Sequence, residues 1–209
     1  MSSPTEPHDQ IGGSAPLGDP IGLFHTWWRG NPLPNFPLYP GLAIGQTDDV
    51  LLIATMSGID VGLIWERFRR SHQPWLARID GQPVAYGWIA SGDLSIGELG
   101  LAVELDSTSR YLWDFQTLPP WRGRGIYPRM LQAIIDHDAA AERFWVGHDL
   151  DNVASARGIA KAGFCQVGPV YRLPDGTLAL TPKGSIDYAA AACAQFRIQL
   201  VDHSSALMR

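Results

Sequence analysis

The sequence predicts an α+β fold, in which helices flank a mixed, mostly antiparallel central sheet. Two stretches predict it. Extended apolar runs flank Asp80-Gly81, and an Asp-Gly pair in that setting is typical of a hairpin of antiparallel strands. An alternating run at 111–118 leads into a glycine-rich turn, after which apolar residues recur at helical spacing from Ile126 to Ile135. Together these stretches indicate a sheet that carries helices.

The other elements follow from the same two periodicities and from capping residues. In chain order, the predicted segments are a short apolar run at 49–56, a helix at 59–70, hairpin strands at 75–79 and 84–89, an extended run at 94–103, a strand at 111–118, a helix from 126 to about 140, a short buried strand at 144–146, a helix that Asp151 or Asn152 caps and Gly163 ends, and a last hairpin of 164–173 and 177–181.

The two ends of the chain differ from its middle. Residues 1–40 hold half of the 16 prolines, which predicts a proline-rich N-terminal extension, partly disordered, before the main domain at 41–184. The aromatic residues between 23 and 39 are too dense for a solvated tail, so we expect them to dock on the domain or on a second subunit, or to form a lid. Residues 185–209 are expected to form a C-terminal amphipathic helix that packs or dimerises, so a homodimer is among the expected assemblies.

Composition narrows the function classes. The net charge of −5 and the isoelectric point near 5.6 argue against general nucleic-acid binding, which needs a basic face. Two cysteines, Cys165 and Cys193, make no disulfide framework, the first 20 residues lack the pattern of a secretion signal, and no apolar run reaches membrane-spanning length. We therefore expect a cytoplasmic protein that binds no membrane. The histidines lack ligand spacing, so no metal site is expected, and His148 and Asp149 are expected at a loop surface.

The glycine-rich turn is the strongest candidate for a binding site. Gly123 and Gly125 let the backbone approach a ligand, and the free N–H groups of the following helix favour an anion such as phosphate. Arg122 and Arg124 add positive charge. The alternative is a plain corner with solvated arginines. Neither of the two commonest nucleotide-binding glycine patterns is present, because Pro128 stands where a third glycine would complete one of them.

Two blocks of the sequence resemble the GNAT superfamily of acyl-CoA-dependent N-acetyltransferases. The first, 122–127, is similar to the acetyl-CoA motif of that superfamily, and the second, Asn152 to Phe164, is similar to its downstream helix. The resemblance covers roughly 42–181 and implies a GNAT-like acyltransferase domain. It implies acetyl-CoA as cosubstrate, no metal, and transfer of the acetyl group to a primary amine by direct attack in a ternary complex. A small-molecule amine is preferred to a protein as the acceptor.

The resemblance also implies the residues that hold the cosubstrate. The end of the strand at 111–118 is expected to pair with the pantetheine arm, the glycine turn to hold the pyrophosphate, and the start of the downstream helix to lie near the pantetheine. The residues implied are Phe115, Gln116, Thr117, Leu118, Arg122, Gly123, Arg124, Gly125, Ile126, Tyr127, Asn152 and Ser155.

The sequence departs from the family pattern at two positions. Ile159 stands where many members carry a tyrosine that protonates the leaving thiolate, and Tyr127 replaces a small residue. Tyr127, Ser155, Tyr171 or solvent remain as proton donors. The departures leave two rivals open, namely a catalytically degenerate acyl-CoA-binding sensor or structural module, and a nucleotide-binding α/β domain, against which the hairpin at 80–81 argues.

Two carboxylates are candidates for the base. Glu98 lies in an apolar run and Asp114 lies between Trp113 and Phe115. A carboxylate in such a run either faces solvent or is partly buried, with a pKa raised toward neutral. Strand alternation predicts that Asp114 shares a face with Leu112 and Gln116. Asp114 is preferred to Glu98, because the family layout places its strand nearer the thioester.

Overall fold

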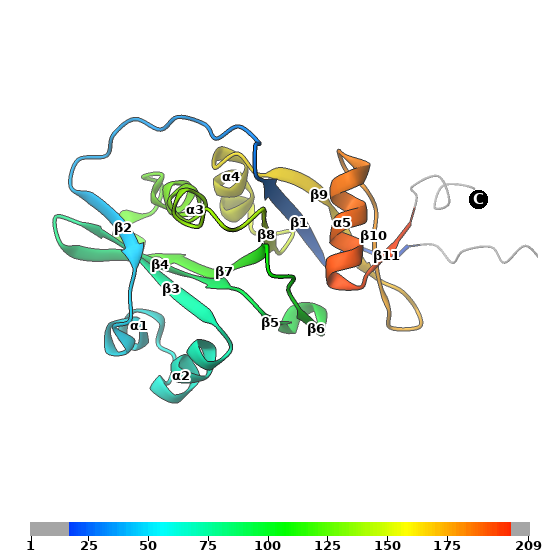
Figure 1. Ribbon diagram of the computed structural model, residues 1–209, viewed down its shortest axis with the longest axis horizontal. Coiled ribbons are helices and arrows are strands. Elements are labelled where there is room, and N and C mark those ends of the chain that lie inside the picture. Colours follow the sequence, from blue (N-terminus) through cyan, green and yellow to red (C-terminus); the bar gives the residue numbers. More distant parts are fainter. Residues whose placement is uncertain (1–16, 202–209) are drawn as a thin grey trace, which may run out of the picture.

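A computed structural model describes residues 17–201 and shows a nine-stranded sheet (Figure 1). In their order across the sheet, its strands are β11 (Gln199–Leu200), β10 (Leu178–Leu180), β9 (Cys165–Arg172), β1 (Gly22–Trp28), β8 (Arg143–His148), β7 (Ser109–Thr117), β4 (Gln82–Ala90), β3 (His72–Ile79) and β2 (Leu42–Gln46). Neighbouring strands are antiparallel except β7 with β8 and β10 with β11. The predicted α+β fold with a mixed, mostly antiparallel sheet is confirmed.

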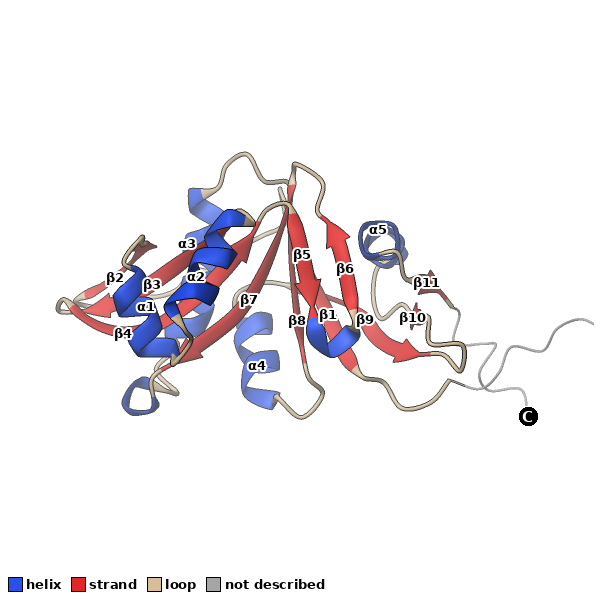
Figure 2. Ribbon diagram, turned by 90° about the horizontal axis from the view of Figure 1, so that it is seen from below, coloured by secondary structure: helices blue, strands red, loops and turns tan. Residues whose placement is uncertain are grey.

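Helices cover both faces of this sheet. They are α1 (Val50–Ser57), α2 (Val61–Arg69), α3 (Ile126–His137), α4 (Val153–Lys161) and α5 (Ile186–Phe196). Helices α3 and α4 lie on one face, and α1 and α2 lie on the other (Figures 1 and 2). The second face also carries a two-stranded sheet of β5 (Asp93–Ile96) and β6 (Leu101–Glu104), which the 3₁₀ turn η1 (Gly97–Leu99) joins.

Three buried clusters hold these layers together. The first packs α3 and Ile159 of α4 against one face of the sheet. The second packs Ile53 of α1 and Ile64 of α2 against Trp88 on the other face. The third joins Phe196 of α5 to β1, β5 and β8. The sheet is therefore packed on both faces, and a point where neighbouring strands separate is a place where a ligand can enter it.

Capping side chains begin four of the helices. Asp49, Asp60, Asn152 and Ser185 each accept a hydrogen bond from a backbone N–H in the first turn of the helix that follows. Helix α3 differs, because its N-cap is Gly125, which has a positive φ of 72° and no side chain. The first N–H groups of α3 are therefore left for another partner.

Part of the expected N-terminal extension belongs to the sheet. Residues 22–28 form β1, which lies between β8 and β9 and pairs antiparallel with both. Phe24 and Trp27 are buried there, so these aromatic residues lie in the core and form no lid. The chain after β1 does dock on the domain, since the Pro34 and Pro37 carbonyls accept hydrogen bonds from α3 side chains. Partial disorder was expected within residues 1–40, and residues 1–16 of that range lie outside the described residues.

Two further expectations are corrected. The run at 94–103 was expected to be one extended segment, but η1 folds it into the hairpin of β5 and β6. Strand alternation in β7 is interrupted by a bulge, because Asp114 and Phe115 together lie opposite Gly87 of β4. Asp114 has a φ of 51° and contacts the same arginine as Trp113, whereas Leu112 packs into the cluster under α3. Asp114 therefore does not share a face with Leu112.

Candidate active site

The site lies where β7 and β8 diverge. Their parallel pairing runs from Ser109 opposite Arg143 to Leu112 opposite Val146 and then stops. Beyond Leu112, β7 stays paired with β4, and beyond Val146, β8 stays paired with β1. A cavity of about 1260 Å³ opens between the two strands. The inner edge of β7 from residue 113 onward therefore faces the cavity without a neighbouring strand.

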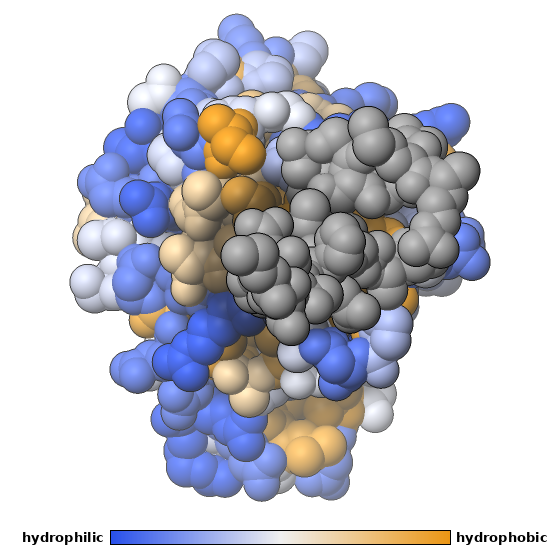
Figure 3. Space-filling view, turned by 90° about the vertical axis from the view of Figure 1, so that its right-hand side faces the viewer, coloured by the Kyte–Doolittle hydropathy of each residue, from blue (hydrophilic) through white to orange (hydrophobic). Residues whose placement is uncertain are grey.

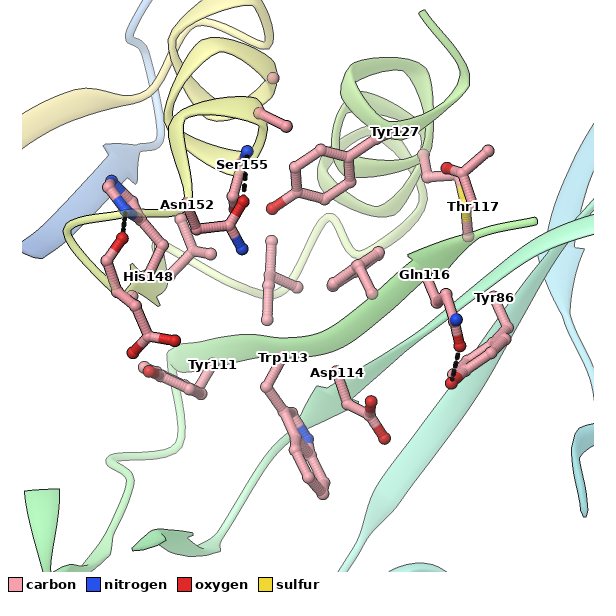
Figure 4. A pocket seen from close by; sticks show the side chains of 18 of the residues that line it. Tyr86, Tyr111, Trp113, Asp114, Gln116, Thr117, Tyr127, His148, Asn152 and Ser155 are labelled. Carbon is pink, nitrogen blue, oxygen red and sulfur yellow. Dashed lines mark hydrogen bonds between the residues drawn. The ribbon is translucent and has the colours of Figure 1, made fainter. Parts of the chain in front are cut away.

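Figure 4 shows that side chains enter this cavity from both sides of β7. Tyr127, Asn152 and Ser155 lie on the side of α3 and α4, whereas Trp113, Asp114 and Tyr86 lie on the other. The charges are divided in the same way. We call the first side, with the lining residues Arg122, Arg157 and Lys161, the cationic half; the second, with Glu98, Asp114, Asp149 and Arg67, is the acidic half.

The cationic half contains the glycine-rich turn. Gly123 and Gly125 have φ values of 77° and 72°, a region that side chains disfavour, and no atom lies within 4 Å of a Cβ added at Gly123. The turn delivers the backbone amides of Ile126 and Tyr127 to the cavity at the start of α3. Three cations and a helix N-terminus together form a site suited to phosphate groups.

Tyr127 lies between the start of α4 and Phe115 of β7. Its hydroxyl points toward Ser155 at the start of α4, and its ring lies 5.3 Å from that of Phe115. Burial raises the pKa of Tyr127 to about 12, partly offset by the Ser155 hydroxyl. The phenol therefore stays protonated at neutral pH and can act as a hydrogen-bond donor.

The acidic half is built around an ion pair. Arg67 of α2 donates from Nη1 to Oδ2 of Asp114 at 2.6 Å. The Arg67 guanidinium lies 4.3 Å from the ring centroid of Trp113 and 4.8 Å from that of Trp88. Cation–π contacts with two indoles hold it in place. Beside this pair, the Tyr86 hydroxyl donates to Gln116 Oε1 at 2.8 Å.

Tyr111 and Glu98 line the same half, nearer the point where the strands diverge. The Tyr111 side chain is buried, and burial followed by the charge of Glu98 raises its pKa. Asp149 raises the pKa of Tyr111 further, so both carboxylates act on this hydroxyl. Glu98 itself is exposed in η1. An ammonium group at this position would have two carboxylates near it.

His148 ends β8 and lines the cavity, in contrast to the loop surface expected for it. Its ring stacks on His25 of β1 with 5.1 Å between centroids. Burial, followed by the charge of His148, lowers the pKa of His25 to about 4. His25 is therefore neutral at physiological pH and contributes no charge to the site.

The structure brings most of the expected site residues together. Asp114, Glu98 and all of the expected cosubstrate residues line the cavity, except Leu118 and Arg124. The Leu118 N–H instead donates to Val84 O at 2.9 Å, which extends the sheet. The Arg124 guanidinium lies over the Trp121 ring at 4.7 Å.

Several lining residues were not identified from the sequence. They are Arg67, Tyr86, Tyr111, Trp113, Arg157 and Lys161. For two of them a signal was present, because Arg157 and Lys161 are four residues apart in the predicted downstream helix and so share a face. The others reach the cavity by tertiary packing. In residues 17–201, no group of three or more His, Cys, Asp or Glu side chains is placed to hold a metal ion.

Residues 51–164 match the profile of the acetyltransferase (GNAT) family. This chain belongs to the GNAT acetyltransferase family. The match includes β7, the glycine turn and α4, so the resemblance of the two sequence blocks is confirmed. Membership supports acyltransferase activity. Among curated proteins, none matches the chain.

Solved structures confirm the GNAT fold. A GNAT-family acetyltransferase from Colwellia psychrerythraea is 19% identical with a TM-score of 0.50, and the alignment covers 75% of this chain and 56% of that one. The aminoglycoside acetyltransferase AAC(6')-Ib, in complex with coenzyme A and kanamycin, is 19% identical with a TM-score of 0.50 over 65% of this chain and 90% of that one. The same enzyme in complex with paromomycin and acetyl-CoA is 18% identical with a TM-score of 0.50, and the alignment covers 65% of this chain and 89% of that one. The chain thus spans 56% of the first relative's length.

Proposed function

We propose that this chain is an N-acetyltransferase that moves the acetyl group of acetyl-CoA to a primary amine of a small molecule, by direct attack in a ternary complex. The observation that carries the proposal is the single cavity that joins the glycine turn to the diverging strands. It offers a cationic, amide-lined half for a pyrophosphate and an acidic half for an amine. The acceptor-bound AAC(6')-Ib structures support a small molecule as the acceptor.

The free edge of β7 fits the pantetheine arm. Residues Phe115 to Thr117 line the cavity beyond the last β7–β8 pair, so their backbone groups on that edge have no strand partner. Asn152 and Ser155 face this edge from α4. The pyrophosphate would lie on the turn from Arg122 to Tyr127. Leu118 and Arg124 do not line the cavity and would act from outside it.

In the reaction the nitrogen loses two protons, the leaving sulfur gains one, and an oxyanion is stabilised. We propose that Asp114 or Glu98 accepts the proton of the bound ammonium; Oδ1 of Asp114 has no hydrogen-bond partner among residues 17–201. The amine nitrogen then forms a bond to the thioester carbon, and a β7 amide stabilises the oxyanion. As the C–S bond breaks, Tyr127 donates a proton to the leaving sulfur, and it is reprotonated by the second proton, which the nitrogen loses as it becomes an amide nitrogen. The products are an amide, CoA and one released proton.

A second candidate function is acyl-CoA binding without turnover. Ile159 favours it, because this side chain is fully buried in α4 and brings no proton donor to the cavity. Tyr127 argues for catalysis instead, since its hydroxyl faces Ser155 inside the same cavity. Turnover of any amine separates the two candidates.

Location and assembly are further proposals. No described helix is long and apolar enough to span a membrane. The free thiols of Cys165 and Cys193 support a reducing compartment, so we propose a cytoplasmic location. Ile186 of α5 and Leu200 of β11 are exposed hydrophobic residues, and they support a homodimer. Figure 3 views the molecule from the side that carries α5 and β11 in Figure 1, and hydrophobic patches lie among hydrophilic residues there. Gel filtration at two concentrations tests the dimer.

Thermal unfolding with acetyl-CoA, CoA and ATP tests the cosubstrate site. Wild type should be stabilised by both CoA species and not by ATP. The double variant Arg157→Glu, Lys161→Glu should lose this stabilisation, because both side chains are exposed and line the cationic half. The control is Lys183→Glu, an exposed residue away from the cavity. No shift with CoA, or an equal shift with ATP, would refute the proposed function.

A further inference from the structure

Arg67 has no role in the proposed transfer, although it lines the cavity. Among the described residues, the other lining arginines and lysines belong to the cationic half, so Arg67 is the one such cation of the acidic half. Its side chain is 18% exposed. Trp88 and Trp113 fix the guanidinium by cation–π contacts at 4.8 and 4.3 Å. A long side chain held in this way faces the cavity with little conformational freedom left to lose on binding.

The Arg67 guanidinium retains hydrogen-bonding capacity. Arginine carries five N–H donors in a planar fork. Within residues 17–201, the structure gives it one hydrogen bond, from Nη1 to Asp114. The unused donors match a carboxylate, the group that a guanidinium binds with two parallel hydrogen bonds.

Asp114 is presented beside Arg67 by a strained backbone. Its φ of 51° is unusual for a residue with a side chain, and the bulge places it on the face of Trp113. The carboxylate is 29% exposed, and one of its oxygens contacts Arg67. The cavity wall thus presents a positive and a negative group side by side. Strain retained at such a position is a reason to look for a function of the side chain that it orients.

We propose that the Arg67–Asp114 pair recognises an acceptor that carries a carboxylate beside its amine, as an α-amino acid does. This inference rests on the proposed acetyl transfer. The acceptor carboxylate binds the free donors of Arg67, and the ammonium lies toward Asp114 and the point where β7 and β8 diverge. Glu98 and Asp149 stand on that side, so the negative charges keep the carboxylate of the acceptor away from the thioester.

Other classes of amine fit this arrangement less well. A polycation would bring a positive group against Arg67, at a repulsive cost in a partly desolvated site. A plain alkylamine would contact Asp114 and leave the donors of Arg67 without a partner. A zwitterion with its two charges on adjacent groups satisfies both members of the pair.

The test compares acids with their amides. CoA release is measured with acetyl-CoA and the twenty L-amino acids, the same amino acids as carboxamides, kanamycin and spermidine. The best amino acid should exceed its own amide in kcat/KM by roughly 10- to 100-fold, the worth of one hydrogen bond to a charged group. The difference should appear mainly in KM, because the carboxylate does not react.

Variants assign this preference to Arg67. Arg67→Gln should bring the acid-to-amide ratio close to one, and Arg67→Lys should keep part of it. The matched control is Arg69→Gln, an exposed residue on the same helix whose nearest ion pair is a 3.9 Å contact with Glu66. Its ratio should equal that of wild type. Folding of each variant is checked by its thermal shift with CoA.

Three outcomes overturn the proposal. They are equal turnover of acids and amides by wild type, a preference for kanamycin or spermidine, and an unchanged acid-to-amide ratio in Arg67→Gln. If no amine is turned over, thermal shifts of the CoA-bound protein decide, and a shift no larger with amino acids than with amides also overturns it. If wild type shows no thermal shift with CoA, by contrast, the proposed function itself is refuted.

Discussion

The ring of Tyr127 lies against Gly158, so a Cβ at residue 158 would stand 2.4 Å from Cδ1 of that ring. The contact joins the glycine turn at the start of α3 to the middle of α4. It explains how a large side chain is accommodated where the family motif has a small residue, because the space is supplied by a glycine on the neighbouring helix. Gly158 thereby determines where the Tyr127 hydroxyl lies.

Gly158→Ala should destabilise the protein by about 1–3 kcal/mol, because a methyl group at this position overpacks the ring of Tyr127. The usual helix preference has the opposite sign, since alanine favours a helix interior over glycine by about 1 kcal/mol. Denaturant unfolding measures the free-energy change. In a Tyr127→Ala background the same substitution should become stabilising, and an equal effect in both backgrounds would contradict the contact.

Tyr127→Phe should lower kcat by about 100-fold, the lower end of what a positioned proton donor contributes. KM for acetyl-CoA should change less, because only the hydroxyl is removed. With a pKa of about 12, Tyr127 stays protonated across the assay range, so it should produce no alkaline limb in the wild-type pH profile. Steady-state kinetics with a saturating amine measure both effects. A kcat within twofold of wild type would exclude Tyr127 as the donor.

Local chemistry explains which elements were predictable. Asp80 and Gly81 have φ values of 49° and 81°, as the turn of a tight hairpin requires, and the dipeptide itself indicates this. β1 was missed, because prolines surround it and because its partners β8 and β9 lie more than 100 residues away in the sequence. No periodicity within a short segment reports pairing over such a distance.

The residues of the site also fall into those that local sequence predicts and those that only the folded structure brings together. The glycine turn and the Asn152 helix start are runs of consecutive residues that resemble family motifs, and this resemblance was enough to place both at one cavity. Asp114 was wrongly predicted to share a face with Leu112. The alternation rule holds only for a regular strand, and the bulge opposite Gly87 adds a residue to β7. Arg67 was missed, because the packing of α2 on the sheet brings it to the cavity.

His25 should make the protein lose stability in acid. Burial and, secondarily, His148 lower the pKa of His25 in the folded protein from 6.5 to about 4. Between pH 6.5 and pH 4, the imidazole is therefore protonated in the unfolded chain and neutral in the folded chain. The contribution of neutral His25 to the free energy of unfolding is fully present above pH 6.5 and is lost as the pH falls toward 4. The loss attributable to His25 at pH 4.5 is about 2.5 kcal/mol.

His25→Leu removes the titrating group and tests this assignment. Urea unfolding at pH 7 and pH 4.5 should show a smaller loss of stability in the variant than in wild type. His137→Gln, an exposed position on α3, is the control and should keep the wild-type difference. An identical pH dependence in His25→Leu and wild type would mean that other groups cause the acid sensitivity.

Gly87→Ala should damage both the fold and the site. A Cβ at residue 87 would lie 2.1 Å from Cδ1 of Phe115, so the ring must move or the bulge must change. We expect a loss of about 3 kcal/mol, as overpacking of a close contact gives. Turnover at saturating amine should also fall, because the neighbouring Asp114 owes its orientation to the bulge.

Gly45→Ala is the matched control for this effect. Gly45 also lies inside a strand, but no atom stands within 4 Å of its added Cβ. Alanine there should be neutral or stabilising by up to about 1 kcal/mol, because glycine loses more backbone entropy on folding. If both substitutions changed the unfolding free energy alike, strand propensity rather than the Gly87–Phe115 contact would explain the result, and the bulge could not be credited with orienting Asp114.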